Sequence, residues 1–146
     1  MKRIFLLLFF GVFELLTVPV SAAGRVEIDE HGYWRGEGAV REHRFDVFLS
    51  SALIRFFQDE GAHSVVDFGC GMGDYVKALR RHHISCEGYD GNPDTPTLSG
   101  GVAGILDISQ PFDLGKRFDW VLSLEVGEHL PKQYERVFLD NLHRHN

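Results

Sequence analysis

The sequence contains little cysteine and no excess of basic residues. Cys70 and Cys86 are the only cysteines among 146 residues, too few for a disulfide framework, and both are expected to be small buried residues. Lys and Arg number 15 against 21 Asp and Glu, which gives a formal net charge of −6. A nucleic-acid-binding surface usually contains an excess of basic residues, so this balance argues against a nucleic-acid partner.

The composition describes an ordinary globular chain with room for one domain. Hydrophobic residues make up 44% and charged residues 25% of the sequence, both typical of folded soluble domains. No Ser-His-Asp or comparable arrangement of catalytic residues is visible in the sequence. Any function must therefore be inferred from local motifs.

The first 22 residues differ in composition from the rest. Met1 to Arg3 is basic, Ile4 to Val20 is almost wholly apolar apart from Glu14, and small residues follow up to Gly24. This order is typical of a secretory signal peptide with cleavage after Ala22 or Ala23, and it predicts a secreted or secretory-lumen protein. The alternative is an uncleaved membrane anchor over residues 4–20, although the length is at the lower limit for a span.

Residues 23–61 are predicted to form a loop followed by an amphipathic helix. The loop is the polar, glycine-rich segment from Gly24 to Gly38, and the helix is expected from Arg41 to Glu60. Gly61 is a natural helix stop. Apolar residues at helical spacing form one continuous stripe that predicts the buried face. The stripe consists of Phe45, Phe48, Leu49, Ala52, Leu53, Phe56 and Phe57.

A glycine-rich turn follows the first predicted strand. The strand runs from His63 to Phe68 and contains Asp67, and a helix is predicted from Asp74 to His82. Between them, glycine stands at every second position from Gly69 to Gly73. Glycine allows a backbone to approach a ligand closely, and the free N–H groups of the following helix favour an anionic or polar group. A tight turn without a ligand is the alternative interpretation.

The segment Asp67-Phe68-Gly69-Cys70-Gly71-Met72-Gly73 resembles the first motif of the class I S-adenosylmethionine (SAM)-dependent methyltransferases. The resemblance covers about Val65 to Leu142. It implies an α/β, Rossmann-like fold over residues 62–146, with a partial parallel sheet of strand order 3-2-1-4 and flanking helices. It also implies cofactor contacts from this turn and the helix after it. These residues are Asp67, Phe68, Gly69, Cys70, Gly71 and Tyr75.

The second strand is predicted from Ile84 to Tyr89 and ends in Asp90-Gly91. Ligands of open α/β sheets collect at the carboxyl ends of strands, and a carboxylate there can accept both hydroxyls of a ribose. In the methyltransferases an acidic residue at this place does so, which assigns Asp90 and Gly91 to the cofactor. The alternative is an Asx-type turn, because Asp, Gly, Asn and Pro all favour turns.

The third strand is predicted from Val102 to Leu106 and is followed by Asp107 and Ile108. In the methyltransferases an acidic residue here bonds the adenine amino group, and the next amide contacts the ring. Asp107 and Ile108 match by position. A helix N-cap or turn aspartate is the alternative.

The fourth strand, Phe118 to Leu124, resembles the fourth motif of the same family, and Leu124 and Glu125 are expected at the cofactor site. Glu125, Glu128 and His129 follow, a pattern similar to the metal-binding phrase of small-RNA 2′-O-methyltransferases. Our assignment is a polar loop at the mouth of the pocket, with Glu125 near the cofactor, His129 near the acceptor and no bound metal. A divalent metal is the alternative.

The resemblance implies methyl transfer from SAM to an unidentified, small-molecule acceptor. Tyr33 and Trp34 then either form part of a lid over the pocket or pack at a core edge. After a last helix, Lys132 to His143, no fifth strand follows, so the fourth strand is expected to be an open edge that favours self-association. The alternative function is a catalytically inactive interaction module with a SAM-binding fold, or a gene fragment.

Overall fold

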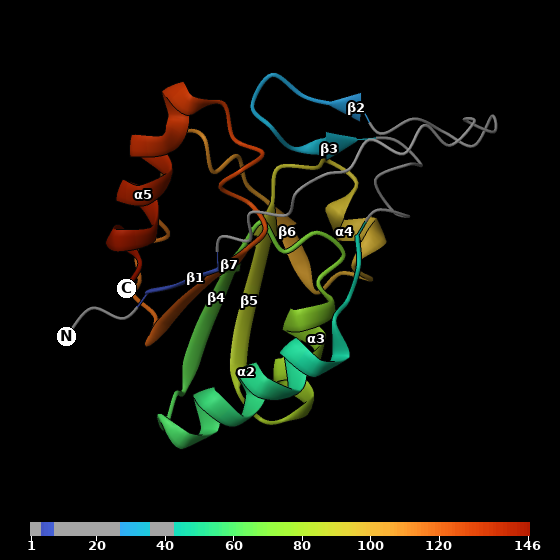
Figure 1. Cartoon of the computed structure of the whole chain (residues 1–146), viewed down its shortest axis with the longest axis vertical. Helices are drawn as coiled ribbons and strands as arrows, with labels where there is room; N and C mark the ends of the chain where they lie inside the picture. Colours follow the sequence, from blue (N-terminus) through green and yellow to red (C-terminus); the bar gives the residue numbers. More distant parts are fainter. Residues whose placement is uncertain (1–3, 8–26, 36–42) are drawn as a thin grey trace.

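The structure, a computed structural model, describes residues 4–7, 27–35 and 43–146. Its centre is a five-stranded, all-parallel sheet of order β1-β7-β4-β5-β6 (Figure 1). The strands are β1 (Ile4–Leu7), β4 (Ser64–Phe68), β5 (Ser85–Asp90), β6 (Ala103–Ile105) and β7 (Trp120–Leu124). The order β6-β5-β4-β7 corresponds to the predicted strand order 3-2-1-4. The predicted order of these four strands is therefore confirmed.

Helices cover both faces of the sheet. α2 (Val47–Asp59) and α3 (Asp74–Arg81) lie on one face, and α5 (Glu135–Arg144) lies on the other (Figure 1). The short α4 (Thr95–Leu98) precedes β6, and the 3-10 helix η1 (Lys132–Tyr134) precedes α5. Predicted strands and helices after residue 62 agree with the structure to within two or three residues at each end.

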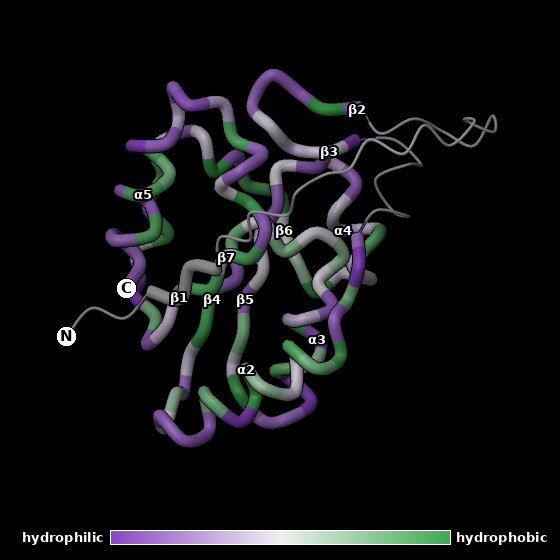
Figure 2. Tube along the Cα trace, viewed as in Figure 1, coloured by the Kyte–Doolittle hydropathy of each residue, from purple (hydrophilic) through white to green (hydrophobic). Residues whose placement is uncertain are grey.

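The alternation of side chains along β4 divides the core into two clusters. Val65 packs with the cluster under α2 and α3, whereas Val66 and Phe68 pack with the cluster under α5. All three side chains are fully buried. Figure 2 shows the apolar residues concentrated along the central strands. Asp67 points to the same face as Val65, because side chains two apart share a face of a strand.

The amphipathic helix begins later than predicted and buries only part of the predicted stripe, namely Leu49, Leu53, Phe56 and Phe57. α2 starts at Val47 because the Asp46 carboxylate accepts the N–H groups of Phe48 and Leu49 and caps the helix. Its buried residues are Ser50, Leu53, Ile54 and Phe57, at spacings of three and four. Phe45, Phe48 and Ala52, assigned to the buried stripe, are exposed, Phe48 to 87%, so those assignments are wrong.

Two further predictions are corrected at the N-terminal side. Residues 27–35, predicted as loop, form an antiparallel hairpin of β2 (Glu27–Ile28) and β3 (Trp34–Arg35). The fourth strand of the prediction, β7, is not an open edge, because β1 pairs with it in parallel from Ile4↔Val121 to Leu7↔Leu124. The predicted self-association surface is therefore covered by the chain's own N-terminal strand.

The predicted signal peptide or anchor falls mostly outside the described residues, including its cleavage site at Ala22 or Ala23. Only residues 4–7 of that segment are described, and they form β1. Among the helices of the described residues, none has the length and hydropathy that a membrane span requires.

Candidate functional site

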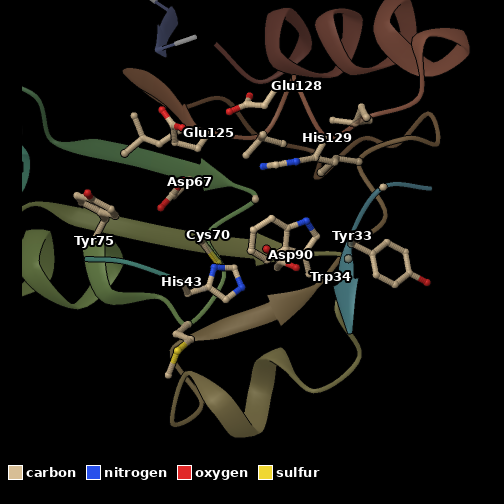
Figure 3. Close-up of a pocket in the computed structure, with 18 of the residues that line it drawn as sticks. Tyr33, Trp34, His43, Asp67, Cys70, Tyr75, Asp90, Glu125, Glu128 and His129 are labelled. Atoms are coloured by element: carbon tan, nitrogen blue, oxygen red, sulfur yellow. The ribbon is translucent and has the colours of Figure 1, made fainter. Parts of the chain in front are cut away.

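A cavity of about 500 Å³ opens at the carboxyl ends of β4, β5, β6 and β7. Its volume lies in the range of small-molecule sites, roughly 300 to 1,000 Å³. The strand ends form its floor, and the β2–β3 hairpin (residues 27–35) and residues 43–45 cover it (Figure 3). Its position is the one at which open α/β sheets bind ligands.

The glycine turn lies at the base of this cavity. Gly69 has φ +82° and Gly71 has φ +54°, a backbone region that other residues adopt at a cost. A Cβ atom on Gly69 would overlap the Val126 side chain, and one on Gly71 would lie 2.7 Å from ring atoms of His43. The two glycines are therefore required both by conformation and by the side chains packed over the turn.

Asp90 connects β5 to the glycine turn. Its Oδ2 accepts the N–H of Gly71 at 2.8 Å, and its Oδ1 accepts the N–H of Asn92 at 2.9 Å. The side chain lines the cavity and the residue is 9% exposed. The Asx-type turn considered for Asp90 is thus present, and the same carboxylate also faces the cavity.

Asp67 is a buried carboxylate without a hydrogen-bond or ion-pair partner among the described residues. It is 2% exposed, lines the cavity and points into it (Figure 3). Burial, with a smaller contribution from the nearby charge of Asp90, raises the pKa of Asp67 to about 8. At neutral pH this group is therefore mostly protonated until a cation is placed beside it.

Asp107 is held from two sides at the end of β6. Its Oδ1 accepts the N–H of Ser109 at 2.9 Å and the Ser109 hydroxyl at 2.6 Å, the local turn considered as the alternative. Its Oδ2 lies 2.7 Å from Nδ1 of His31, a residue of the β2–β3 hairpin. Asp107 and the neighbouring Ile108 both line the cavity.

The aromatic residues of the β2–β3 hairpin cover the cavity. Trp34 contacts the ring of His43 at a centroid distance of 5.6 Å and that of His129 at 4.9 Å. Tyr33 lies against Gly91, where a Cβ atom would be 2.5 Å from Tyr33 Cδ1. Tyr33 and Trp34 were considered either as part of a lid over the pocket or as residues packed at a core edge. In the structure they lie over the pocket.

A polar wall follows β7. Glu125 adopts φ +54°, rare for a residue with a side chain, and lines the cavity with Glu128 and His129. Burial and the neighbouring Glu128 carboxylate raise the pKa of Glu125. Within the residues that the structure describes, no three His, Cys, Asp or Glu side chains converge as metal ligands would.

Ten of the twelve residues predicted to contact a cofactor line the cavity. They are Asp67, Gly69, Cys70, Tyr75, Asp90, Gly91, Asp107, Ile108, Leu124 and Glu125. Phe68 does not, because alternation along β4 turns its ring into the opposite core, 5.2 Å from the ring of Phe112. Gly71 is covered by His43 and donates its N–H to Asp90.

The sequence interpretation missed cavity residues that come from outside the strand ends. His31 and Gly32 come from the hairpin, His43, Arg44 and Phe45 precede α2, and Met72 belongs to the glycine turn. The aromatic pair Tyr33-Trp34 was the only signal for this cover. Nothing in the spacing of residues 43–45 relates them to the end of β4, the strand that begins about twenty positions later.

Comparison with known proteins assigns the family. A model of a methyltransferase-domain family matches residues 40–145, which include α2 as well as the sheet. The chain therefore belongs to this methyltransferase family. It is also 30% identical over 135 residues to a probable chloroplastic tocopherol O-methyltransferase of rice (Oryza sativa subsp. japonica), covering 78% of this chain and 36% of the relative.

Solved structures share the fold at low sequence identity. CalS10, an amino pentose methyltransferase of Micromonospora echinaspora solved with SAM bound, gives a TM-score of 0.61 at 20% identity over 73% of this chain and 48% of that one. KedS8, a sugar N-methyltransferase of Streptoalloteichus, gives a TM-score of 0.61 at 19% identity, over 92% of this chain and 56% of that one. The fold is therefore the class I SAM-dependent methyltransferase fold, and the chain spans about a third of the rice relative's length.

Proposed function

We propose that this chain binds SAM and transfers its methyl group to a small-molecule acceptor. The observation that supports the proposal most is the set of three carboxylates, Asp67, Asp90 and Asp107, at the ends of three neighbouring strands around one cavity. The glycine turn after β4 lies beside them. An adenosine carrying an amino acid presents amino, hydroxyl and cationic groups, and carboxylates recognise all three.

The residues present fit that cofactor. Asp67 has no partner among the described residues and suits a cation, because a positive group beside it would stabilise its ionised form. Asp90 suits the ribose hydroxyls and Asp107 the adenine amino group, by the positions that they occupy at the strand ends. When bound, SAM supplies a methyl group on a sulfonium, which a nucleophile can displace.

The rest of the site would orient the acceptor and take up its proton. Glu125, Glu128 and His129 form the polar wall of the cavity, and each can accept a proton from a hydroxyl or amine. His43 and Phe45, which precede α2, also line the cavity and would limit access of water. Orientation of acceptor and methyl group supplies much of the rate in such a displacement.

A small molecule is the acceptor class that the cavity favours. The space is about 500 Å³, which is a size typical of small-molecule sites. The net charge of −6 also disfavours a nucleic-acid acceptor. The rice relative is named for a tocopherol and two structural neighbours for sugars, so both kinds of acceptor are suitable first choices for an assay.

The test is calorimetric titration of the 146-residue chain with S-adenosylhomocysteine (SAH), the demethylated cofactor, followed by transfer of labelled methyl from SAM to a panel of amino sugars and phenols. We expect saturable SAH binding and transfer to at least one acceptor. Binding without transfer would favour the alternative, a SAM-binding module without catalysis. No binding at high micromolar SAH would contradict the proposal.

A further inference from the structure

The β2–β3 hairpin (residues 27–35) already occupies groups that the proposed cofactor needs. His31 Nδ1 lies 2.7 Å from Asp107 Oδ2 and 2.7 Å from Ser109 Oγ. The His31 ring stacks on Tyr134, with centroids 5.4 Å apart and an interplanar angle of 14°. Because Oδ1 of Asp107 already accepts two hydrogen bonds from Ser109, His31 is bonded to the oxygen that remains available to a ligand.

The next two aromatic residues of the hairpin extend the same contact. Tyr33 packs directly on Gly91, the residue after Asp90. Trp34 lies between His43, which covers Gly71 of the glycine turn, and His129 (Figure 3). His31 therefore reaches the end of β6, and Tyr33 reaches the end of β5. Trp34 contacts His43, the side chain that covers the glycine turn after β4. These are the three places assigned to the cofactor.

The contacts of the hairpin are not fully satisfied. The indole Nε1 of Trp34 is buried and has no hydrogen-bond acceptor among the described residues. A buried donor without an acceptor is unfavourable. The hairpin is also short, with two residues in each strand, and two-stranded ribbons of this kind are only marginally stable by themselves. The pairing of its own strands therefore contributes little to holding the hairpin in place.

We infer that the β2–β3 hairpin is an internal plug of the cofactor site, in which His31 takes the place on Asp107 that the adenine amino group takes when SAM binds. The inference rests on the proposed function. An imidazole N–H and an exocyclic amino group are both N–H donors to a carboxylate, so they compete for Asp107. Entry of the cofactor then requires the hairpin to move, and the apparent affinity is lowered by the fraction of closed molecules.

Hydrogen exchange of the unmodified 146-residue chain tests the direction of this movement. Amides of the hairpin include the N–H of Gly32, which donates to the Asp29 carbonyl, and the N–H of Asp29, which donates to the Tyr33 carbonyl. We expect saturating SAH to increase exchange over residues 27–35. A decrease would mean that the hairpin closes over the bound cofactor as a lid, which overturns the plug.

Variants of His31 test the competition itself. We expect His31→Ala to bind SAH about threefold to tenfold more tightly, through faster association, because the hairpin loses its 2.7 Å contact with Asp107. His31→Gln, whose amide can still donate to Asp107, should remain close to the wild type. Glu27→Gln, an exposed position in the same hairpin, is the control.

The remaining outcomes are also decisive. Unchanged or weaker SAH binding by a folded His31→Ala variant would contradict the plug while leaving the cofactor site intact. If His31→Ala does not fold, the exchange experiment on the unmodified chain still decides. Absence of SAH binding by the wild type and by His31→Ala together would overturn the proposed function, and the plug with it.

Discussion

Asp90 at the end of β5 is bonded to the glycine turn that follows β4: its Oδ2 accepts the N–H of Gly71 at 2.8 Å. The two neighbouring strand ends are thereby fixed to each other at the base of the cavity. The same carboxylate accepts the Asn92 N–H through its other oxygen. A group assigned to ribose binding therefore also holds the backbone that surrounds the ligand.

Asp90 substitutions should affect both binding and stability. We expect Asp90→Ala to weaken SAH binding by about tenfold to several hundredfold, because charge-assisted bonds contribute roughly 1.5–3 kcal/mol each. It should also lower the free energy of unfolding by about 1–3 kcal/mol, since the Gly71 N–H is left without its acceptor. Asp90→Asn should cost less in both, because its carbonyl still accepts one bond.

The control for Asp90 is Asp94→Ala. Asp94 is exposed, and its side chain does not cap α4. Calorimetric titration with SAH and urea unfolding measure the two effects separately. Equal SAH affinity for the wild type and Asp90→Ala would show that the ribose assignment is wrong.

Stability should fall with rising pH because of Asp67. The pKa of its carboxyl is ordinarily 3.8, the value expected in the unfolded chain, and is about 8 in the folded chain. Between pH 3.8 and pH 8 the folded chain therefore holds a proton that the unfolded chain has released. The contribution of Asp67 to stability is therefore complete below about pH 4 and decreases by up to about 1.4 kcal/mol per pH unit as the pH rises toward 8. Asp67→Asn should flatten this dependence.

Urea unfolding between pH 5 and 8 measures the effect, with Asp94→Asn as an exposed carboxyl control. If the slopes of the wild type and Asp67→Asn are equal, Asp67 ionises normally in the folded chain.

Cofactor binding should show the opposite dependence on pH. A cation beside Asp67 favours its ionised form, so SAM binding should release a proton below pH 8. We therefore expect SAM affinity to increase from pH 6 to pH 8, and this increase to be absent in Asp67→Asn. Titrations in buffers of different ionisation enthalpy measure the proton directly, and no proton release near pH 7 would contradict the cation role.

Gly69→Ala should be more destabilising than the same change at a glycine with free space. Gly69 has φ +82° and is packed against Val126, whereas Gly115 has φ +69° and no atom within 4 Å of an added Cβ. Backbone strain of about 1–3 kcal/mol applies to both, and the overlap with Val126 applies only to Gly69. Thermal unfolding compares the two variants, and an equal loss of stability would show that Val126 moves away without cost.

The N-terminal segment has two incompatible interpretations that an experiment separates. We propose that residues 1–22 act as a signal peptide or membrane anchor, whereas in the structure residues 4–7 form β1 at the edge of β7. A chain beginning at residue 23 lacks β1, so it should unfold at lower temperature than the full chain and associate through the exposed edge of β7. Sedimentation at several concentrations measures this association.

A monomeric, equally stable chain from residue 23 would show that β1 contributes nothing to the fold. N-terminal sequencing of protein expressed in a secreting host, together with carbonate extraction of its membranes, tests the signal-peptide proposal. A soluble protein that still begins at Met1 would contradict it.

The sequence by itself determined the parallel sheet and most of its strand ends. Short apolar runs with a carboxylate at or near their ends (Asp67, Asp90 and Asp107), together with the glycine turn, are local signals, and right-handed crossovers leave few ways to arrange such strands. Local patterns also indicated that α4 could be no more than one turn long. These features depend on neighbours in the chain, which a sequence displays directly.

Only the tertiary structure decided what covers the site. The contacts of His31 with Asp107 and of Trp34 with His129 join residues more than seventy positions apart, and no spacing rule relates such pairs. The exposure of Phe48 and the placement of Phe68 in the opposite core likewise depend on which face meets the sheet. Long-range packing sets these outcomes, because the free energy of burial depends on the partner surface and not on the segment alone.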